Sequence, residues 1–376
     1  MSATVSEIAR VLEAWAPGGT AQSWDNVGLQ VGRPDAEVTR AVIALDMTPH
    51  VLEEARAMHA ELIVTHHPLL FRGIKRVTPD GLVPGLVLGL AEQGIALYSI
   101  HTNLDAARDG VSFELARRLG ARDVTFLSGL EDAVRKLVTF VPPDDADAVH
   151  QALAAAGAGR IGHYEACAFR SDGTGQFRPG AQANPHTGTA GGPLESVPEI
   201  RLEMEVAAHR VSAVVAALRD AHPYEEVAYD LYPVQQPYRD AGLGAIGQLP
   251  ESIPLGTFLD RVADALASPG LRYAGDPERM VQRVAVCGGS GSDFIPVAQR
   301  AGADVYVTAD ITYHTWFDVM APDGSVAMAL VDPGHYETER LTEDLLRDRL
   351  ADAIPDVTWH VTGTRTAPVR TWLAGN

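Results

Sequence analysis

The chain has 376 residues, of which 46% are hydrophobic and 21% charged, a composition typical of a folded globular protein rather than a disordered one. Its net charge of −19 argues against nucleic acid or an anionic membrane as a partner, because no basic surplus can displace counterions from phosphates. The only cysteines, Cys167 and Cys287, exclude a disulfide framework and a cysteine-rich zinc site, and they fit a reducing cytoplasm.

The first residues of the chain predict an amphipathic helix. Ile8, Val11, Leu12 and Trp15 recur at helical spacing. The segment lacks the basic and continuous apolar regions of a secretory signal, and no stretch of the sequence is apolar for long enough to span a membrane. We therefore expect a cytoplasmic protein without a membrane-spanning segment.

The first third of the sequence alternates between strand-like and helical patterns. Strand-like runs lie at 40–46, 61–67 and 95–101, and helical patterns lie at 49–60 and 83–94. This alternation predicts a mostly parallel sheet with helices packed on it. Such folds carry their chemistry at the carboxyl ends of the strands.

The middle of the sequence has a different pattern. Strand-like runs lie at 136–142, 164–170, 199–207 and 227–234, and helical patterns lie at 145–159 and 209–223. A stretch rich in glycine, proline and asparagine fills 171–195. The order of elements, βαββαβ, predicts a ferredoxin-like domain, in which two helices cover one face of a small sheet.

The first pattern resumes after this module. Strand-like runs lie at 282–289, 304–310 and 325–332, and helical patterns lie at 292–302 and 335–353. The sequence therefore predicts an α/β core domain, mostly a parallel sheet, interrupted by an inserted ferredoxin-like α+β domain. We expect the first core segment at 1–130, the insert at 131–241 and the second core segment at 242–376.

Three motifs at predicted strand ends carry residues that bind metals. They are His66-His67, the run HTNLD from His101 to Asp105, and HYETE, which begins a helix at His335. His335 and Glu339 are four residues apart and share a helix face, whereas Glu337 points elsewhere. Imidazole and carboxylate groups together suit zinc, manganese or ferrous iron.

Each motif also has an ordinary structural explanation. His335 and Glu339 can form a simple polar pair on a helix, His-His-Pro can be turn chemistry, and HTNLD can cap the helix that follows. A metal site is favoured because all three motifs lie at the carboxyl edge of strands in one domain. Together the motifs supply more ligands than one four-coordinate ion with an open position can bind. They suit two ions that share a bridging carboxylate and a water.

Two further segments lie at strand ends of the second core segment. The glycines of CGGSGSDF (287–294) can present backbone N–H groups to an anion, or they can form a tight structural turn. Asp310 and His314 can lie near the same rim as ligands, as partners of ligands or as proton carriers.

Five motifs in order resemble the Nif-three-like family, and the resemblance runs from about Ile8 to Trp372. They are SWDNVGLQVG (23–32), LDMTPHVLEEA (45–55), THHPLLF (65–71), SIHTNLDAA (99–107) and GHYETE (334–339). Its members are dinuclear-metal proteins, often labelled GTP cyclohydrolase I type 2 homologues. FRPGAQANP (177–185) and HPYEEVAYDLYP (222–233) resemble the inserted domain of the longer bacterial members, which is similar to the signal-transduction PII and copper-tolerance CutA folds.

The resemblance implies two divalent metal ions per chain, either zinc, iron or manganese. The implied metal ligands are His66, His67, Asp105, His335 and Glu339. His101 and His314 match family positions close to the metals and are the candidates for proton transfer. Members form homohexamers, so we expect a hexamer here. One departure is Ala309, where the family usually has glycine; alanine disfavours a positive φ, so the turn that leads to His314 can differ.

The expected function is that of a metal-dependent hydrolase resembling GTP cyclohydrolase I type 2, with a bridging water or hydroxide as the nucleophile. Its substrate is then a small molecule or nucleotide, and His101 or His314 carries protons. Two alternatives remain open from the sequence. One is a non-catalytic regulatory or scaffold protein that binds metal and senses a ligand or partner through its insert. The other is a two-metal phosphoesterase.

Overall fold

The structure is a computed structural model that describes residues 2–372, so positions 1 and 373–376 of the expected core domain lie outside the described residues. The chain divides into two compact units: unit 1 contains Met1–Gly129 and Asp240–Asn376, and unit 2 contains Leu130–Arg239. The mixed α/β class expected from the sequence is confirmed. Among the described helices, none is long and apolar enough to cross a membrane.

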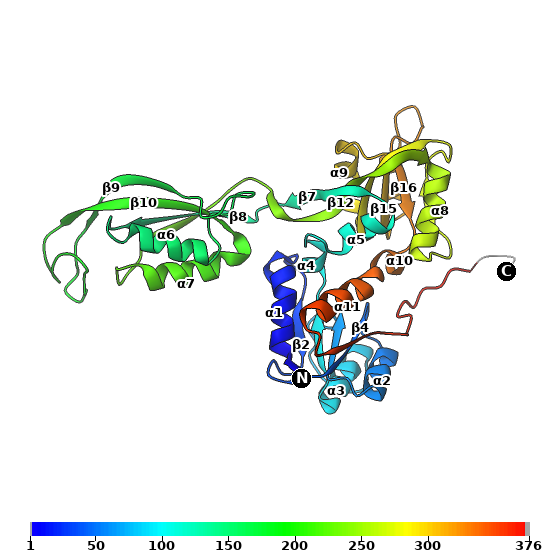
Figure 1. The fold of residues 1–376 in the computed structure, drawn as a ribbon, viewed down its shortest axis with the longest axis horizontal. Coiled ribbons are helices and arrows are strands. Elements are labelled where there is room, and N and C mark those ends of the chain that lie inside the picture. The colour runs from blue at the N-terminus through cyan, green and yellow to red at the C-terminus, as the bar shows by residue number, and fades with distance from the viewer. Residues whose placement is uncertain (1, 373–376) are drawn as a thin grey trace. The chain divides into compact units, whose positions relative to one another are not determined.

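The first sheet of unit 1 has the strand order β17-β4-β5-β6-β2. Figure 1 labels two of these strands, β4 and β2. The strands are β17 (Thr358–Val361), β4 (Arg40–Ala44), β5 (Leu62–Thr65), β6 (Ala96–Ser99) and β2 (Gly28–Val31). The first four are parallel, and β2 is antiparallel to β6. Every residue of β5 and β6 is buried, as expected of strands covered on both faces. Because β5 and β6 run in the same direction, the residues that follow them, including His66 and His101, meet at one edge.

Helices pack on both faces of this sheet. They are α1 (Val5–Trp15), α2 (Pro49–Ala57) and α3 (Leu82–Gln93). The next helices are α4 (Thr102–Asp105) and α5 (Val111–Arg118), of which α5 packs against the second sheet. The short elements are β1 (Ala3–Thr4), η1 (Gly18–Thr20) and β3 (Glu37–Val38). The predicted first helix is α1, which begins with a capping box between Thr4 and Glu7. Val42 and Ile63 pack toward α2 and α3, whereas Ile43 packs on the opposite side with the apolar face of α1.

The second sheet of unit 1 has the order β13-β16-β15-β14-β12-β7, and β14, β15 and β16 are parallel. The strands are β7 (Arg122–Leu130), β12 (Tyr238–Pro254), β13 (Arg272–Ala274), β14 (Met280–Ser290), β15 (Val305–Ala309) and β16 (Ala329–Asp332). The accompanying helices are α8 (Leu255–Leu266), η3 (Ser292–Phe294), α9 (Ile295–Arg300) and η4 (His314–Val319). The helix predicted at 292–302 is thus shorter than expected and begins as a 3₁₀ turn.

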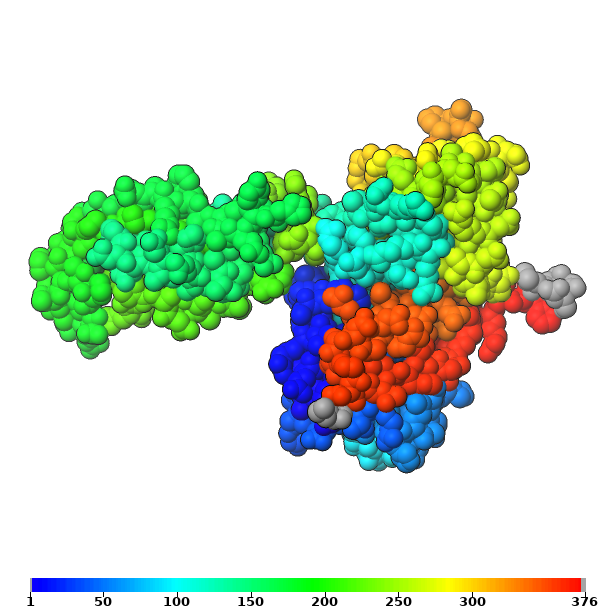
Figure 2. All heavy atoms as spheres, viewed as in Figure 1, coloured from blue at the N-terminus to red at the C-terminus, as the bar shows by residue number. Residues whose placement is uncertain are grey.

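The single helix predicted at 335–353 is two helices, α10 (His335–Glu339) and α11 (Leu341–Ala353), separated at Arg340. The hydroxyl of Thr342 donates to the carbonyl of Glu339 at 2.7 Å, and the N–H of Glu343 donates to the carbonyl of Arg340 instead. This backbone hydrogen bond spans three residues, where an α-helix has four, and it interrupts the α-helical pattern. Figure 2 shows α11, in orange-red, on the surface of unit 1 beside the blue atoms of α1.

Unit 2 contains β8 (Val134–Val141), α6 (Ala146–Ala155), β9 (Phe169–Phe177), β10 (Glu195–Ala207), η2 (Ala208–Arg210), α7 (Val211–Ala221) and β11 (Tyr229–Pro233). Its sheet has the order β11-β8-β10-β9, and its adjacent strands are antiparallel. Both helices cover the same face of the sheet (Figure 1). Leu202 and Met204 of the sheet pack there against Val149 and Val214.

The course of β9 differs from the sequence expectation. A strand was expected at 164–170, but β9 runs through the glycine-containing stretch 169–177. It does so because β10 pairs with it along nine positions, from Glu203↔Phe169 to Glu195↔Phe177. Pairing with a long neighbouring strand therefore outweighs the low strand propensity of Gly173 and Gly175.

Candidate metal centre

Five side chains from separate parts of unit 1 meet at one edge of the first sheet. They are His66 and His67 after β5, Asp105 at the end of α4, and His335 and Glu339 on α10. Their potential ligand atoms form two groups that fall within 4.8 Å, one with His66 and Asp105 and one with His67 and His335, and Glu339 belongs to both. A third group joins His66 and His67 to His101. The residues expected from the sequence are therefore close enough to bind metal together.

Glu339 directs its two carboxylate oxygens to different imidazoles. Its Oε1 lies 3.9 Å from Nε2 of His66, and its Oε2 lies 2.9 Å from Nε2 of His67 and 2.9 Å from Nε2 of His335. The adjacent rings of His66 and His67 are 5.2 Å apart between centroids. Neighbouring histidines that diverge at a strand end thus contact opposite sides of one carboxylate.

Two buried atoms in the first group have no hydrogen-bond partner among residues 2–372, namely Nε2 of His66 and Oδ1 of Asp105. They lie 3.7 Å apart. Nδ1 of His66 donates to the carbonyl of Ile100 at 2.8 Å, so neutral His66 presents a lone pair on Nε2. Unpartnered buried polar atoms are unfavourable, and a cation between these two satisfies both. The donor set therefore fits a divalent metal.

The outer nitrogens of the imidazoles are held by carboxylates. Nδ1 of His67 donates to Asp46 at 2.7 Å, and Nδ1 of His335 donates to Asp310 at 2.7 Å. Such partners fix the tautomer and orientation of metal-binding histidines. Asp310 was predicted from the sequence as a possible partner of a ligand, but Asp46 was given no such role. The only sign of a role for Asp46 in the sequence is its position at the end of the strand predicted at 40–46.

The glycines at the end of β14 pack directly against α10. Gly289 has a φ of +59°, and a Cβ at this position would overlap Oε1 of Glu339 and lie 3.2 Å from Cε1 of His335. Its N–H donates to the hydroxyl of Thr338 at 3.0 Å. Gly289 thus has a structural role, because it leaves room for the Glu339 carboxylate, although it lies at an irregularity of the strand and not in the tight turn that the sequence had offered.

The charges in the cluster are strongly coupled. Burial opposes ionisation of Glu339, but hydrogen bonds from the imidazoles hold the pKa of its carboxyl well below the usual range. Burial and the neighbouring Glu339 raise the pKa of Asp105 to about 7. Burial lowers the pKa of His67 and His335, yet their carboxylate partners outweigh it and raise these pKa values to about 10 and 9. A cation in this cluster therefore competes with protons on the imidazoles.

Comparison with known proteins identifies the family. The family model Duf34/NIF3 (NGG1p interacting factor 3) matches residues 3–368. The chain belongs to the Duf34/NIF3 family.

Curated relatives of this NIF3-family chain carry the name GTP cyclohydrolase 1 type 2 homolog. The Bacillus subtilis protein is 39% identical over 91% of this chain and 90% of its own length, and the Mycobacterium tuberculosis protein is 40% identical over 90% and 89%. Among solved structures, the Bacillus cereus protein related to NIF3 matches with a TM-score of 0.78 and 36% identity over 98% of this chain and 99% of that chain. The Staphylococcus aureus protein SA1388 matches with a TM-score of 0.75 and 28% identity over the same shares.

The two expected proton carriers of this NIF3-family chain differ in position. His101 lies in the cluster, with its ring 5.2 Å from that of His66, and its Nδ1 donates to Asp25 at 2.9 Å. Asp25 also accepts from the N–H of Thr102 at 3.1 Å, a role that the sequence did not reveal although the residue stands in the motif SWDNVG. His314 is exposed at the start of η4, with its ring beside Tyr313. Its part in proton transfer stays a prediction.

Two other sequence expectations concern the surroundings of the cluster. Glu337 points away from the cluster, as expected, and accepts from Arg365 at 2.8 Å. Ala309 ends β15 with its side chain buried, and the positive φ of +55° falls on Asp310 instead. The alanine is therefore accommodated, because the left-handed residue of this turn is the aspartate that holds His335.

A cavity of about 460 Å³ adjoins the cluster. His67 and His335 line it together with Tyr336, Arg272 and Arg365. Arg365 lies over the ring of Tyr336 at 4.3 Å from its centroid, and Arg272 pairs with Asp332. The cavity thus joins the candidate ligand imidazoles to an aromatic ring and two guanidinium groups, and each guanidinium is paired with a carboxylate of the lining, Asp332 or Glu337.

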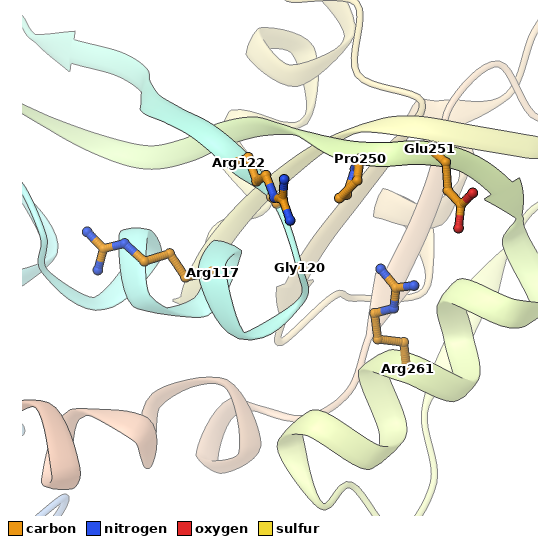
Figure 3. A pocket seen from close by; sticks show the side chains of 7 residues that line it. Arg117, Gly120, Arg122, Pro250, Glu251 and Arg261 are labelled. Carbon is orange, nitrogen blue, oxygen red and sulfur yellow. The ribbon is translucent and has the colours of Figure 1, made fainter.

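A separate hollow of about 320 Å³ lies at the α5–β7 junction (Figure 3). Its lining residues are Arg117, Gly120, Ala121, Arg122, Pro250, Glu251 and Arg261. Arg117 is turned toward its partners Asp109 and Glu114 on its own segment. Since this hollow shares no lining residue with the cavity beside the cluster, we do not assign it to the metal centre.

Proposed function

We propose that this chain is a hydrolase that binds two divalent metal ions and acts on a small anionic substrate, with GTP as the first compound to test. The observation that carries the proposal is the sharing of Glu339 between two separate groups of potential ligands. A carboxylate that serves two groups is the usual bridge of a two-metal site. The names of the curated relatives point to GTP.

In this proposal His66, Asp105 and one oxygen of Glu339 hold one ion, and His67, His335 and the other oxygen hold the second. When bound, such ions lower the pKa of a water molecule and polarise the substrate, which supplies a nucleophile at neutral pH. Histidines and carboxylates are compatible with zinc, iron or manganese, so the identity of the metal depends on its supply. Asp46 and Asp310 keep the imidazoles turned toward the ions.

The remaining residues bind the substrate and move a proton. Asp25 fixes the Nδ1–H of His101, which leaves Nε2 of that ring to accept or donate a proton at the cluster. Arg272 and Arg365 on the cavity wall orient an anionic group. Removal of the Arg365 guanidinium is then expected to raise KM more than it lowers kcat.

We further infer that unit 2 is a ferredoxin-like domain inserted into the metal-binding core, and that the chain assembles into a hexamer. The order of elements in unit 2 and the resemblance to the longer bacterial members support the first inference. Light scattering on the purified protein tests the second. A mass of about six times the chain mass of 40.1 kDa is expected, and a monomer or dimer over the working concentration range contradicts it.

Elemental analysis combined with a turnover assay tests the proposed function. After reconstitution, about two metal ions per chain are expected, together with GTP turnover that disappears in His66→Ala and His67→Ala while the protein stays folded. Fewer than one ion per chain under saturating supply contradicts the two-metal site. Two ions without turnover of GTP or of phosphoesters contradict the hydrolase and favour a binding protein.

A further inference from the structure

Unit 2 contains a cavity of its own, with a volume of about 660 Å³ and a lining drawn from residues 140–228. A volume of this order falls in the range of small-molecule sites. The cavity lies on the face of the sheet that α6 and α7 leave uncovered. Leu202 and Met204 of β10 pack toward the helices, so the alternating residues Glu199 and Arg201 face the cavity side.

A buried carboxylate lies in this cavity. Glu199 is only 9% exposed, and its Oε1 accepts from the hydroxyl of Tyr224 at 2.9 Å. Its Oε2 has no hydrogen-bond or ion-pair partner among the described residues, and it is not one of their fully buried unpartnered atoms, so it remains accessible from the cavity. Burial and the neighbouring Glu199 raise the pKa of Tyr224, so the phenol remains the donor. A carboxylate oxygen that faces the cavity without a protein donor can accept hydrogen bonds from a ligand with N–H groups.

The backbone of β9 makes room for this carboxylate. Residues 173 and 175 are both glycine, and they pair with positions 199 and 197 of β10. A Cβ at Gly175 would overlap Oε2 of Glu199. Glycine inside a strand weakens the strand, and it commonly marks a place where another group must approach closely. The glycines therefore allow Glu199 to lie flat over β9 with one oxygen available.

Aromatic and basic side chains complete the cavity. The ring of Tyr224 lies 6.4 Å from that of Phe177 and 5.8 Å from that of His186. Arg201 is 5.8 Å from the centroid of the Phe140 ring, and it uses its Nε to donate to Glu203. Arg178, also on the cavity wall, has no hydrogen-bond or ion-pair partner within residues 2–372. The cavity thus offers an acceptor, flat apolar surfaces and guanidinium groups at once.

We propose that this cavity binds a planar heterocycle with a 2-amino-4-oxopyrimidine edge and an anionic substituent, the chemistry shared by guanine nucleotides and pterin carboxylates. The adjacent ring N–H and amino groups of such an edge donate to Glu199. The rings of Phe177 and Tyr224 contact the flat faces of the heterocycle, and Arg178 and Arg201 pair with the anionic substituent. Adenine is excluded from this mode, because its ring N1 is an acceptor and repels the carboxylate.

Calorimetric titration of the full-length chain tests the proposal. The probes are GMP, pterin-6-carboxylate and, as the comparison, AMP. The titrations use metal-free protein that carries His67→Ala, so that the metal centre contributes no binding. We expect about one site per chain for GMP, for pterin-6-carboxylate or for both, with AMP at least about tenfold weaker. Binding of GMP alone identifies a nucleotide ligand, and binding of pterin-6-carboxylate alone identifies a pterin.

Variants of the cavity separate this mode from nonspecific binding. Glu199→Gln is expected to weaken binding at least about tenfold, because the amide offers a single acceptor and a repelling N–H₂ group. Gly175→Ala keeps the carboxylate but displaces it, so binding weakens there too. Glu226→Gln removes an exposed carboxylate from the same wall and serves as the matched control, with affinity expected within about twofold of the parent. Circular dichroism checks that each variant is folded. If Glu199→Gln does not fold, Gly175→Ala alone tests whether the Glu199 carboxylate contacts the ligand.

Three results would overturn the proposal. The first is the absence of binding by both GMP and pterin-6-carboxylate at millimolar concentration. The second is AMP binding as tightly as GMP. The third is unchanged affinity in folded Glu199→Gln or Gly175→Ala, which would mean that the carboxylate does not contact the ligand.

Discussion

Nε2 of His67 lies 2.9 Å from Oε2 of Glu339, although 272 positions separate the two residues in the chain. His67 follows a strand of the first sheet, and Glu339 lies on a helix of the second core segment. The candidate metal centre therefore exists only when both segments of unit 1 are folded against each other. Metal bound there must stabilise this association, because the unfolded chain does not hold the ligands together.

Replacement of Glu339 by glutamine is expected to reduce the metal content from about two ions per chain to below one, because one residue serves both groups of ligands. Inductively coupled plasma analysis after reconstitution measures this. The matched control is Glu337→Gln on the same helix, which breaks the ion pair with Arg365 but removes no cluster ligand. It should keep its metals. Equal metal content in both variants contradicts the bridging role of Glu339.

Gly289→Ala is expected to reduce both stability and metal content. The residue has a positive φ, which alone costs about 1 kcal/mol for alanine, and its new methyl group would displace the Glu339 carboxylate. Gly302→Ala is the control, since Gly302 has a φ of +72° and open space where the new methyl group would lie. Chemical denaturation should show a loss of about 1 kcal/mol in Gly302→Ala and a larger loss in Gly289→Ala, and only Gly289→Ala should lose metal. Full metal content in Gly289→Ala rules out the packing role assigned to this glycine.

The placement of the candidate ligands at strand ends could be predicted from the sequence, and so could Asp310 as a partner, but Asp25 and Asp46 could not. His66 and His67 end an apolar run, and parallel strands bring such ends to one edge of a sheet. Asp25 and Asp46 pair with imidazoles 76 and 21 positions away, and no local pattern encodes such contacts. The break at Arg340 depends on one hydroxyl of Thr342, a detail that helical periodicity cannot carry.

His101→Gln is expected to keep about two metals per chain and to lower kcat by about 10²–10⁴-fold, as for the loss of a proton-transfer group. Asp25→Asn should have a smaller effect of the same kind, because it leaves the imidazole in place without its partner. Steady-state kinetics on metal-loaded protein measure both. If His101→Gln loses one equivalent of metal, His101 is a ligand and not a proton carrier.

The affinity of the centre for metal is expected to rise with pH between 7 and 9. In the protein without metal, the carboxylate partners raise the pKa values of His67 and His335 to about 10 and 9, so both rings hold protons at neutral pH. Metal binding must release these protons. For each proton released, the affinity for metal rises about tenfold with every unit of pH. Competition with a coloured chelator at several pH values measures the dependence, and calorimetry in buffers of different ionisation enthalpy counts the protons released.

The same protons make the stability of the metal-free protein depend on pH in the opposite direction. Both pKa values are raised on folding from an ordinary value near 6.5, so their contribution is fully present below about pH 6.5 and is lost as the pH rises through 9 and 10. Tm of the metal-free protein should therefore fall over this range, while the gap between metal-loaded and metal-free protein widens. His360→Gln is the control, since His360 pairs with Glu54 outside the cluster and its loss should leave both trends intact. A metal affinity that does not change between pH 7 and 9 would show that the imidazoles of the cluster are not the groups that metal displaces.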